Sequence, residues 1–405
     1  MASGSLDLTR PTADSAYGVA FVDWLACACG GTGERAARAA RAAGEGMLGE
    51  VAFAASAGHV LDFDDTFSDG VAHVSATCAP AALVLAARLG RTQGEMLAAY
   101  AEGFEAMAAV AAASHPALYR GGWHPTAVCG PIGAAVVAAR LLGLSEAERD
   151  NAVAAAVLRA GGTRAAFGSD GKAIQVGQAA AAGVQAALLA QAGVQVDPAA
   201  IFGELGFVGV LGAAWPAWPA GVVGGSGGAG DGAPAIERNW IKLHPSCLGT
   251  HSPIECAAAA LDGGFGLDGG GVEVVVHPVA RQAAHRDAVH DGLAAKFSIP
   301  YCVGFTLLRG RSPRVRDFAG VDEEVCAAAR DVAVVVDASL PEFGAVLRSG
   351  GGELARVPYP RGGPENPASA DDLALKVADL AGGRLDGVLA DPEAPAALVL
   401  EALGI

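Results

Sequence analysis

Apolar residues recur at helical spacing along most of the N-terminal half of the chain. This spacing predicts helices over residues 13–43, 52–60, 79–89, 95–112, 127–142, 147–160 and 172–192. Gly30-Gly31 divides the first of these stretches into two helices. Thr92 with Glu95, and Ser145 with Glu148, have the spacing of capping boxes, which satisfy the free backbone groups at a helix start. We therefore expect an all-helical bundle here.

The pattern changes at residues 213–234, where Gly, Pro and Trp replace the periodicity and predict a loop. Beyond it, valine-rich runs predict strands at 272–277, 331–336 and 353–358. Helices are expected at 252–261, 300–308, 371–381 and 395–403. The predicted fold is mainly α, with a large all-helical domain over 1–243, joined by C-terminal helices in 370–405, and a smaller α+β domain over 244–369.

Composition supports closely packed helices in a soluble chain. Of the 405 residues 52% are hydrophobic but only 6% are aromatic, and alanine, which lets helix axes approach closely, is abundant. Mean hydropathy is +0.37. Apolar runs such as 179–192 are interrupted by Gly183, Gln185 and Gln191 before they reach the roughly 20 residues of a membrane span. The N-terminus lacks the pattern of a signal peptide. We expect a cytoplasmic protein that does not bind a membrane.

The charge balance and the cysteines narrow the possible partners. The net charge is −16, from 43 acidic and 27 basic residues, which argues against nucleic acid as a partner because phosphates would be repelled. An anionic substrate would therefore need a local group of cations. The eight cysteines include no C-x-x-C spacing, so a zinc ribbon or an iron–sulfur cluster is not expected.

One polar cluster stands inside an otherwise apolar helical region, in the stretch 58–80, GHVLDFDDTFSDGVAHVSATCAP. Asp62, Asp64 and Asp65 lie within four positions, and Thr66 and His73 follow. Charged groups are rarely buried without partners or a function. A capping turn is the ordinary explanation of such aspartates. The three aspartates with His73 could also bind a divalent cation.

Further polar residues occur where the helical pattern does not require them. His124 precedes a helix, and Lys172 stands at a helix start, where the helix dipole disfavours a cation. Lys242 and Tyr301 could be an ordinary surface lysine and an ordinary core tyrosine. Each residue has such an explanation on its own. Taken together, they are the residue types that a binding site for a carboxylic acid requires.

Five segments resemble the MmgE/PrpD superfamily, which includes 2-methylcitrate dehydratase and cis-aconitate decarboxylase. They are LDFDDT with a following His, GWHPTAVCGPIGAA, AGGTRAAFGSDGKAIQVGQAAAAGVQAALLA, IKLHPSCLGTHSPIE and AKFSIPYCVGFTLLRG, in this order. The resemblance covers most of residues 13–310. It implies that the α+β domain is a lid, that the protein is a homodimer, and that the active site lies between the domains without a metal or another cofactor.

Site residues follow from the resemblance, position by position. It implies a catalytic set of Asp62, His124, Lys172 and Tyr301, and a substrate-binding set of Thr66, His73, Lys242 and His251. We expect Asp62 to orient a base or a lysine, and His124 and Lys172 to lie nearest the reacting carbon. Tyr301 would be a proton donor or a carboxylate anchor. The lysines would repel a metal ion, which weighs against a cation site at the aspartates.

The expected function is that of a lyase acting on a small di- or tricarboxylic acid, as a dehydratase or decarboxylase. Elimination of water requires a base for the proton next to a carboxylate and an acid for the leaving hydroxyl, and His, Lys and Tyr can take these roles. Two alternatives stay open. An isomerase or epimerase would remove and return a proton, and a non-catalytic binding protein would keep the fold alone.

Overall fold

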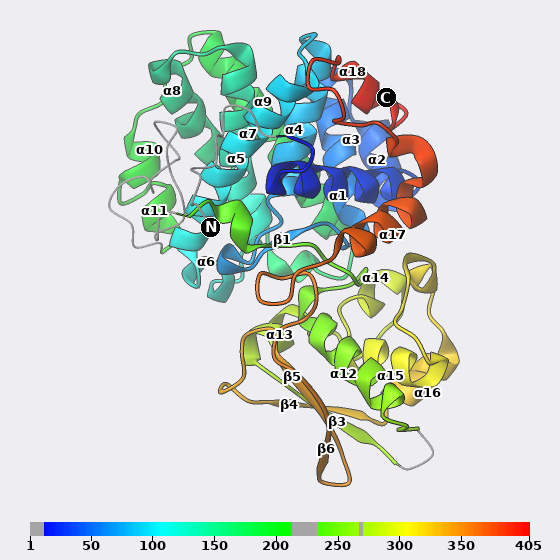
Figure 1. The fold of residues 1–405 in the computed structure, drawn as a ribbon. Helices are drawn as coiled ribbons and strands as arrows, with labels where there is room; N and C mark the ends of the chain where they lie inside the picture. The colour runs from blue at the N-terminus through cyan, green and yellow to red at the C-terminus, as the bar shows by residue number, and fades with distance from the viewer. Residues whose placement is uncertain (1–11, 213–232, 267–269) are drawn as a thin grey trace.

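The computed structural model describes residues 12–212, 233–266 and 270–405. It confirms the mainly α fold with a smaller α+β part (Figure 1). The loop predicted at 213–234 falls almost entirely outside the described residues. In Figure 1 the helical part lies above and the α+β part below, with the short strand β1, Thr66–Phe67, between them.

The helices of the first part follow the predicted stretches closely. They are α1 Ala16–Gly31, α2 Arg35–Ala43, α3 Gly46–Val60, α4 Ser75–Arg88, α5 Gln93–Ser114, α6 Ala117–Arg120, α7 Pro125–Leu142, α8 Glu146–Val157, α9 Asp170–Gln191, α10 Ala199–Phe202 and α11 Phe207–Val210. Both predicted capping boxes are present, at Thr92 with Glu95 and at Ser145 with Glu148. The short helices α6, α10 and α11 are not predicted by the pattern, because one turn is too short to show a period.

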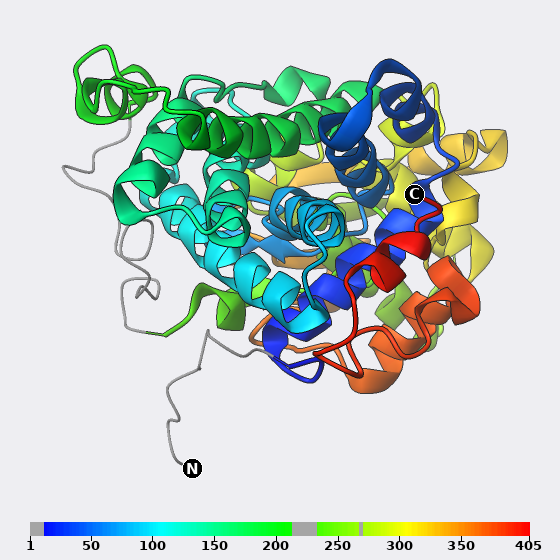
Figure 2. The ribbon, with the colours of Figure 1, turned by 90° about the horizontal axis from the view of Figure 1, so that it is seen from above.

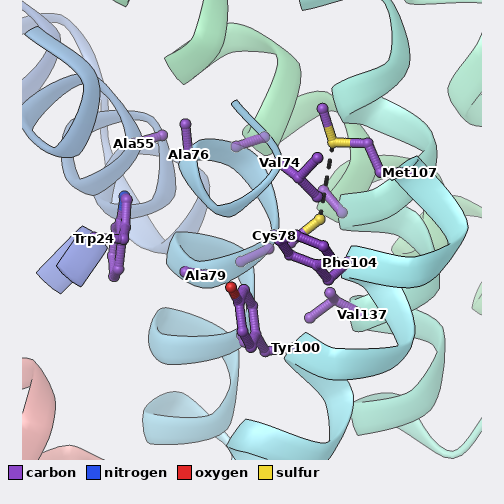
Figure 3. Close-up of a cluster of buried hydrophobic side chains, with 14 of the residues drawn as sticks. Trp24, Ala55, Val74, Ala76, Cys78, Ala79, Tyr100, Phe104, Met107 and Val137 are labelled. Carbon is purple, nitrogen blue, oxygen red and sulfur yellow. Dashed lines mark hydrogen bonds between the residues drawn. The ribbon is translucent and has the colours of Figure 1, made fainter. Parts of the chain in front are cut away.

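Helix α7 contacts α4, α5, α8 and α9, and Figure 2 shows the helices of this part packed side by side. Small residues allow this packing. A Cβ atom added to Gly183 of α9 would lie 2.4 Å from the carbonyl oxygen of Pro131 in α7, so only glycine fits at this crossing. Trp24, Tyr100 and Phe104 fill the space around α4 and α5 (Figure 3). Burial of these large side chains is the main force that stabilises the bundle.

Three of these helices, α5, α7 and α9, are long and apolar enough to cross a membrane by length and composition alone. The expectation that glycine and glutamine residues interrupt the apolar runs before they reach the length of a membrane span is therefore wrong for these helices. In the structure 83%, 89% and 61% of their most apolar stretches are buried inside the protein. Their apolar character is thus largely accounted for by packing against neighbouring helices.

The second part contains a four-stranded sheet with the strand order β4-β3-β5-β6. Its strands are β3 Val272–Val276, β4 Val332–Val336, β5 Ala345–Ser349 and β6 Gly352–Val357. Strands β3 and β4 are parallel, and the other pairs are antiparallel. The helices are α12 His251–Asp262, α13 Pro278–Ala283, α14 Gly292–Ala295, α15 Ile299–Arg309 and α16 Glu323–Ala329. Helix α12 packs on β5 and β6, and α15 packs on β4.

The chain ends on the helical part. Helix α17, Ala370–Ala381, packs against α1, and α18, Ala397–Glu401, packs against α4. In Figure 1 the orange α17 lies beside the end of α1, and the red α18 lies near the top of the helical part. Between the two parts, β1 pairs with β2, Asn239–Trp240, with Thr66 opposite Trp240. This pairing places the aspartate cluster beside the segment that leads into the second part. The division into domains at 243 and 369 stays a prediction.

Candidate active site

A small cavity of about 40 Å³ lies where the helical part meets the second part. The helical part contributes Asp62, Thr66, Val71, His73, Tyr119, His124, Phe167 and Lys172 to its lining. The second part contributes Cys247, Leu248, Ala283, Phe297 and Phe343. A larger cleft of about 950 Å³ contains none of the predicted site residues. Its charged groups include the exposed ion pair of Arg361 and Asp372, so the small cavity is the better candidate for chemistry.

Asp62 stands directly beyond the end of α3 and has φ of +52°, in the left-handed region. Asp and Asn tolerate this conformation better than other side chains. Its carboxylate pairs with the ammonium groups of Lys172 and Lys242, the latter at 3.4 Å. Lys242 also donates to the backbone carbonyl of Asp62. Burial opposes ionisation of Asp62, but the two lysines outweigh it and hold its pKa well below the usual range.

A third lysine, Lys296, reaches the same loop and is not among the predicted site residues. Its ammonium donates to the backbone carbonyl of Leu61, and to that of Pro245 at 3.1 Å. Burial, with the positive charge of Lys242, lowers the pKa of Lys296 to about 8. Lys296 belongs to the AKFSIPY segment, so a close reading of that motif could have found it.

Two histidines share one carboxylate oxygen behind the cavity. Oδ2 of Asp64 lies 2.8 Å from Nδ1 of His59 and 3.2 Å from Nδ1 of His73. Both Nδ1 atoms act as donors to this oxygen, which leaves Nε2 of each ring without a hydrogen. Burial lowers the pKa of His59 to about 4, so this ring is neutral. His59 and Asp64 are further residues absent from the predicted site set.

The same three residues could hold a metal ion by composition, because their ligand atoms lie within 4.8 Å of one another. The fit is poor for two reasons. The Nδ1 atoms are already directed to Asp64, and the charge of Lys172 is close enough to lower the pKa of His59 and His73, so it would also repel a cation. Asp65 does not join this group, because it accepts hydrogen bonds from Ser75 and Asn239 instead.

His124 is held as a neutral base at the start of α7. Its Nδ1 lies 3.0 Å from Oε1 of Gln175, whose Nε2 in turn donates to the carbonyl of Thr163 at 3.4 Å. This orientation of the amide makes Nδ1 the protonated nitrogen and leaves Nε2 as an acceptor. Nε2 is buried and finds no hydrogen-bond partner within the described parts of the chain. Burial, with the charge of Lys172, lowers the pKa of His124 well below its usual value.

Helix starts supply further positive potential to the cavity. His124 is the residue before α7, Lys172 lies in the first turn of α9, and His73 stands shortly before α4. His73, His124 and Lys172 line the same cavity, so the N-terminal ends of these three helices meet there. Thr126 in the first turn of α7 accepts from the backbone N–H of His73 at 2.9 Å, which joins two of the starts. Helix N-termini favour anions.

The structure brings together six of the eight predicted residues. Asp62, Thr66, His73, His124 and Lys172 line the cavity, and Lys242 lies behind Asp62. Tyr301 lines another pocket, and its hydroxyl accepts from the backbone N–H of Asp322 at 3.1 Å. His251 is buried with Nε2 3.2 Å from the carbonyl oxygen of Ser246. The roles of Tyr301 and His251 stay predictions that no contact in the cavity supports.

The fold combines a large helical part with a smaller α+β part, and a buried cluster of acidic and basic side chains lies between them. This combination is the one expected from the family resemblance. Its sequence matches the profile of the MmgE/PrpD N-terminal domain over residues 49–216 and that of the MmgE/PrpD C-terminal domain over residues 244–401. The chain belongs to the MmgE/PrpD family. The human protein cis-aconitate decarboxylase is 33% identical over 158 residues, which is 37% of this chain and 32% of the human protein.

Proposed function

We propose that this protein is a lyase that acts on a small di- or tricarboxylic acid, as a dehydratase or decarboxylase of the 2-methylcitrate/cis-aconitate type. The observation that carries the proposal is the unpartnered Nε2 of His124 in a cavity that also contains the ammonium of Lys172. Membership of the MmgE/PrpD family and the partial similarity to a cis-aconitate decarboxylase support it.

The charges around the cavity favour a substrate with several carboxylates. The buried cations Lys172, Lys242 and Lys296 stand against the carboxylates Asp62 and Asp64. The histidines are neutral, so the three lysines exceed the two carboxylates by one positive charge. The N-termini of three helices add to this positive potential. Taking an anion out of water is costly unless cations and donors replace its hydration. A chain with a net charge of −16 needs such a local excess of cations.

The proposed mechanism uses the side chains of the cavity for acid–base chemistry. In a dehydration, Nε2 of His124 takes the proton next to a carboxylate, and Lys172 binds the carboxylate whose negative charge grows as the proton leaves. In a decarboxylation, the same lysine holds a retained carboxylate while carbon dioxide departs. Asp62 fixes the position of the Lys172 ammonium in both cases. Gln175 fixes the tautomer of His124.

Proton NMR of the purified protein in heavy water tests the proposal, with a panel of 2-methylcitrate, citrate, cis-aconitate and several hydroxy dicarboxylates. An alkene signal or loss of a carboxylate would establish a lyase. Deuterium entering an unchanged carbon skeleton would instead establish an isomerase or epimerase. No change with any acid would contradict the proposed function.

The role of His124 has a matched test. We expect His124→Asn to lower kcat at least 100-fold, because general base catalysis contributes about 10²- to 10⁴-fold. His290, whose side chain is 72% exposed, provides the control, and His290→Asn should keep the wild-type rate. Equal rates for the wild type and His124→Asn would remove His124 from the mechanism.

A further inference from the structure

Tyr119 is a buried tyrosine of the helical part that lines the candidate active site. It lies in the short helix α6, five residues before His124, and only 2% of its surface is exposed. Its ring packs in the hydrophobic cluster of the second part, together with Phe167 and Phe297. Tyr119 therefore belongs to the surface where the two parts of the molecule meet over the cavity.

The hydroxyl of Tyr119 is buried and has no hydrogen-bond partner among residues 12–212, 233–266 and 270–405. Leaving a buried hydroxyl without a partner is unfavourable, and buried hydroxyl groups usually have one. A free hydroxyl in the lining of a cavity is therefore available for a ligand. Nε2 of His124, a residue that lines the same cavity, is likewise buried without a hydrogen-bond partner in the described parts of the chain.

Arg164 fixes the position of this tyrosine. Its guanidinium carbon lies 3.8 Å from the centre of the Tyr119 ring, over the ring face. The same guanidinium donates to the backbone carbonyl of Tyr119 at 2.9 Å and to that of Gln282 in the second part at 2.7 Å. The contact covers the face of the ring, and the guanidinium also lies close to the hydroxyl, where its charge opposes the rise in the pKa of Tyr119 that burial causes.

Tyr301, by contrast, uses its hydroxyl to bind the backbone N–H of Asp322, outside the cavity. The family resemblance predicts that Tyr301 is a proton donor, but Tyr301 does not line the cavity. Tyr119 is a tyrosine that does line it. We propose that Tyr119 is the hydroxyl that binds the substrate carboxylic acid and donates a proton in the lyase reaction. This inference rests on the proposed function and names a further catalytic residue for it.

The proton transfer balances for either lyase reaction. In a decarboxylation, the C–C bond breaks, carbon dioxide leaves, and the electron pair that remains on carbon takes the phenolic proton. In a dehydration, the phenolic proton joins the leaving hydroxide to form water. Either step leaves a phenolate, which regains a proton from solvent when the product departs. The positive charge of Arg164 against the ring stabilises the phenolate between these events.

Burial raises the pKa of Tyr119, and the charge of Arg164 acts in the opposite direction. The resting side chain is therefore protonated at neutral pH and can serve as a donor. A proton donor must carry its proton when the substrate arrives.

Tyr119→Phe and Tyr17→Phe form a matched pair, since each removes one oxygen from a buried ring, and Tyr17 does not line the cavity. We expect Tyr119→Phe to lower kcat at least 100-fold on the acid that the wild type converts, and to keep or raise the melting temperature, because the lost hydroxyl has no partner. Tyr17→Phe should keep kcat and lower the melting temperature, because it loses the hydrogen bond to Glu105. Wild-type turnover by Tyr119→Phe, or an equal loss of turnover in Tyr17→Phe, would overturn the inference.

Binding of tricarballylate separates this inference from the proposed function, because this tricarboxylate has no hydroxyl to eliminate and no double bond. Isothermal titration should show binding to the wild type and about tenfold weaker binding to Tyr119→Phe. If no acid of the panel is converted but this difference is seen, the proposed reaction fails and the contact with the acid stands. Equal binding to both proteins overturns the contact. Absence of binding to the wild type overturns both proposals.

Discussion

At the scale of single residues, Asp62 balances the charges of the candidate site. It is buried in a left-handed backbone conformation, and its carboxylate and carbonyl oxygens receive two ammonium groups. Such a conformation costs of order 1–3 kcal/mol and persists only where the surroundings enforce it. The lysines provide that enforcement, so the position of Lys172 and the conformation of Asp62 depend on one another.

We expect Asp62→Asn to lower the free energy of unfolding by about 3–5 kcal/mol, because it leaves Lys172 and Lys242 buried without their carboxylate. Asparagine also tolerates the left-handed conformation, so the substitution tests the charge and not the backbone. Urea denaturation measures the loss. Asp69→Asn is the control, since Asp69 pairs with the half-exposed Arg238 and should cost at most about 1 kcal/mol. Equal losses in the two variants would contradict this account of Asp62.

Gln175 should set the pH dependence of the reaction through His124. We expect Gln175→Glu to raise the pKa of His124, because a carboxylate beside Nδ1 favours the imidazolium form. The acidic limb of the kcat/KM profile should then move to higher pH. Gln178→Glu adds the same charge at an exposed position of the same helix and should leave the profile unchanged. Superimposable profiles for the wild type and Gln175→Glu would show that Gln175 does not position the base.

Asp65 should make the protein less stable as pH rises. Burial, with the charge of Asp23, raises the pKa of Asp65 from 3.8 to about 8 although Ser75 donates to it. A folded-state pKa above the unfolded value means that the folded state holds the proton more tightly, so the stability that it contributes declines from about pH 4 to pH 8. Asp65→Asn should flatten this part of the curve and be more stable than the wild type at pH 8 by more than about 1 kcal/mol. Parallel stability curves from pH 5 to 9 would disprove the shift.

At the scale of elements, glycines set how closely α9 approaches its neighbours, and α9 carries Lys172. A Cβ atom added to Gly177 would lie 2.3 Å from Oγ of Ser56 and 2.6 Å from the carbonyl oxygen of Ala52, both in α3. The spacing of α9 and α3, and with it the position of Lys172, thus depends on residue 177 having no side chain.

Gly177→Ala should therefore lower the free energy of unfolding by about 1–3 kcal/mol through overpacking. Because α9 must shift to admit the methyl group, turnover should fall as well. Gly161→Ala is the matched control, as a Cβ atom there meets open space. Thermal denaturation of both variants measures the effect, and equal melting temperatures would show that the contact between α9 and α3 can relax freely.

Most elements could be predicted from the sequence because their signals are local. Helices α5 and α8 begin at capping boxes, and β3 and β4 are runs of valine. Strand β5 has no comparable signal, because its five residues include Arg348 and Ser349 and its position depends on pairing with β3 and β6. Tertiary pairing, which the local pattern does not contain, decides such a strand.

The site could be predicted only where the family motifs name its residues. Asp62, His124 and Lys172 come together as expected, whereas Tyr119 and Gln175 lie inside or beside motif segments without any feature that marks them. Their significance lies in an unpartnered hydroxyl and an oriented amide, which are properties of packing between distant segments. For the same reason the sequence could not show where Tyr301 directs its hydroxyl.

At the scale of the whole molecule, helix α17 holds the loop that carries Asp62 in place. The ammonium of Lys376 lies 2.6 Å from Oδ1 of Asp23, donates to the carbonyl of Phe63 at 2.6 Å and to that of Lys242 at 2.9 Å. One side chain thus joins α1, the segment after Asp62 and the segment after β2. The site is enclosed by residues from nearly the full length of the chain.

Lys376→Met should cost about 3–5 kcal/mol, since it leaves Asp23 buried without a cation and two carbonyls without a donor. The double variant Asp23→Asn with Lys376→Met should recover part of this loss, because it removes the uncompensated charge. Guanidinium denaturation of the wild type, the single variant and the double variant measures both effects. A double variant that is no more stable than Lys376→Met would show that the ion pair is not the source of the loss.

The bond from Lys376 to Phe63 spans 313 positions of the chain, which has a consequence for biosynthesis. The N-terminal part of a protein generally begins to fold while the ribosome is still adding residues. Here the bundle can assemble early. The loop that carries Asp62, however, can form its hydrogen bond with Lys376 only after α17 has left the ribosomal tunnel. A nascent chain that stops short of α17 would have the side chains of the candidate site without their final arrangement, so we expect activity only after α17 has been synthesised.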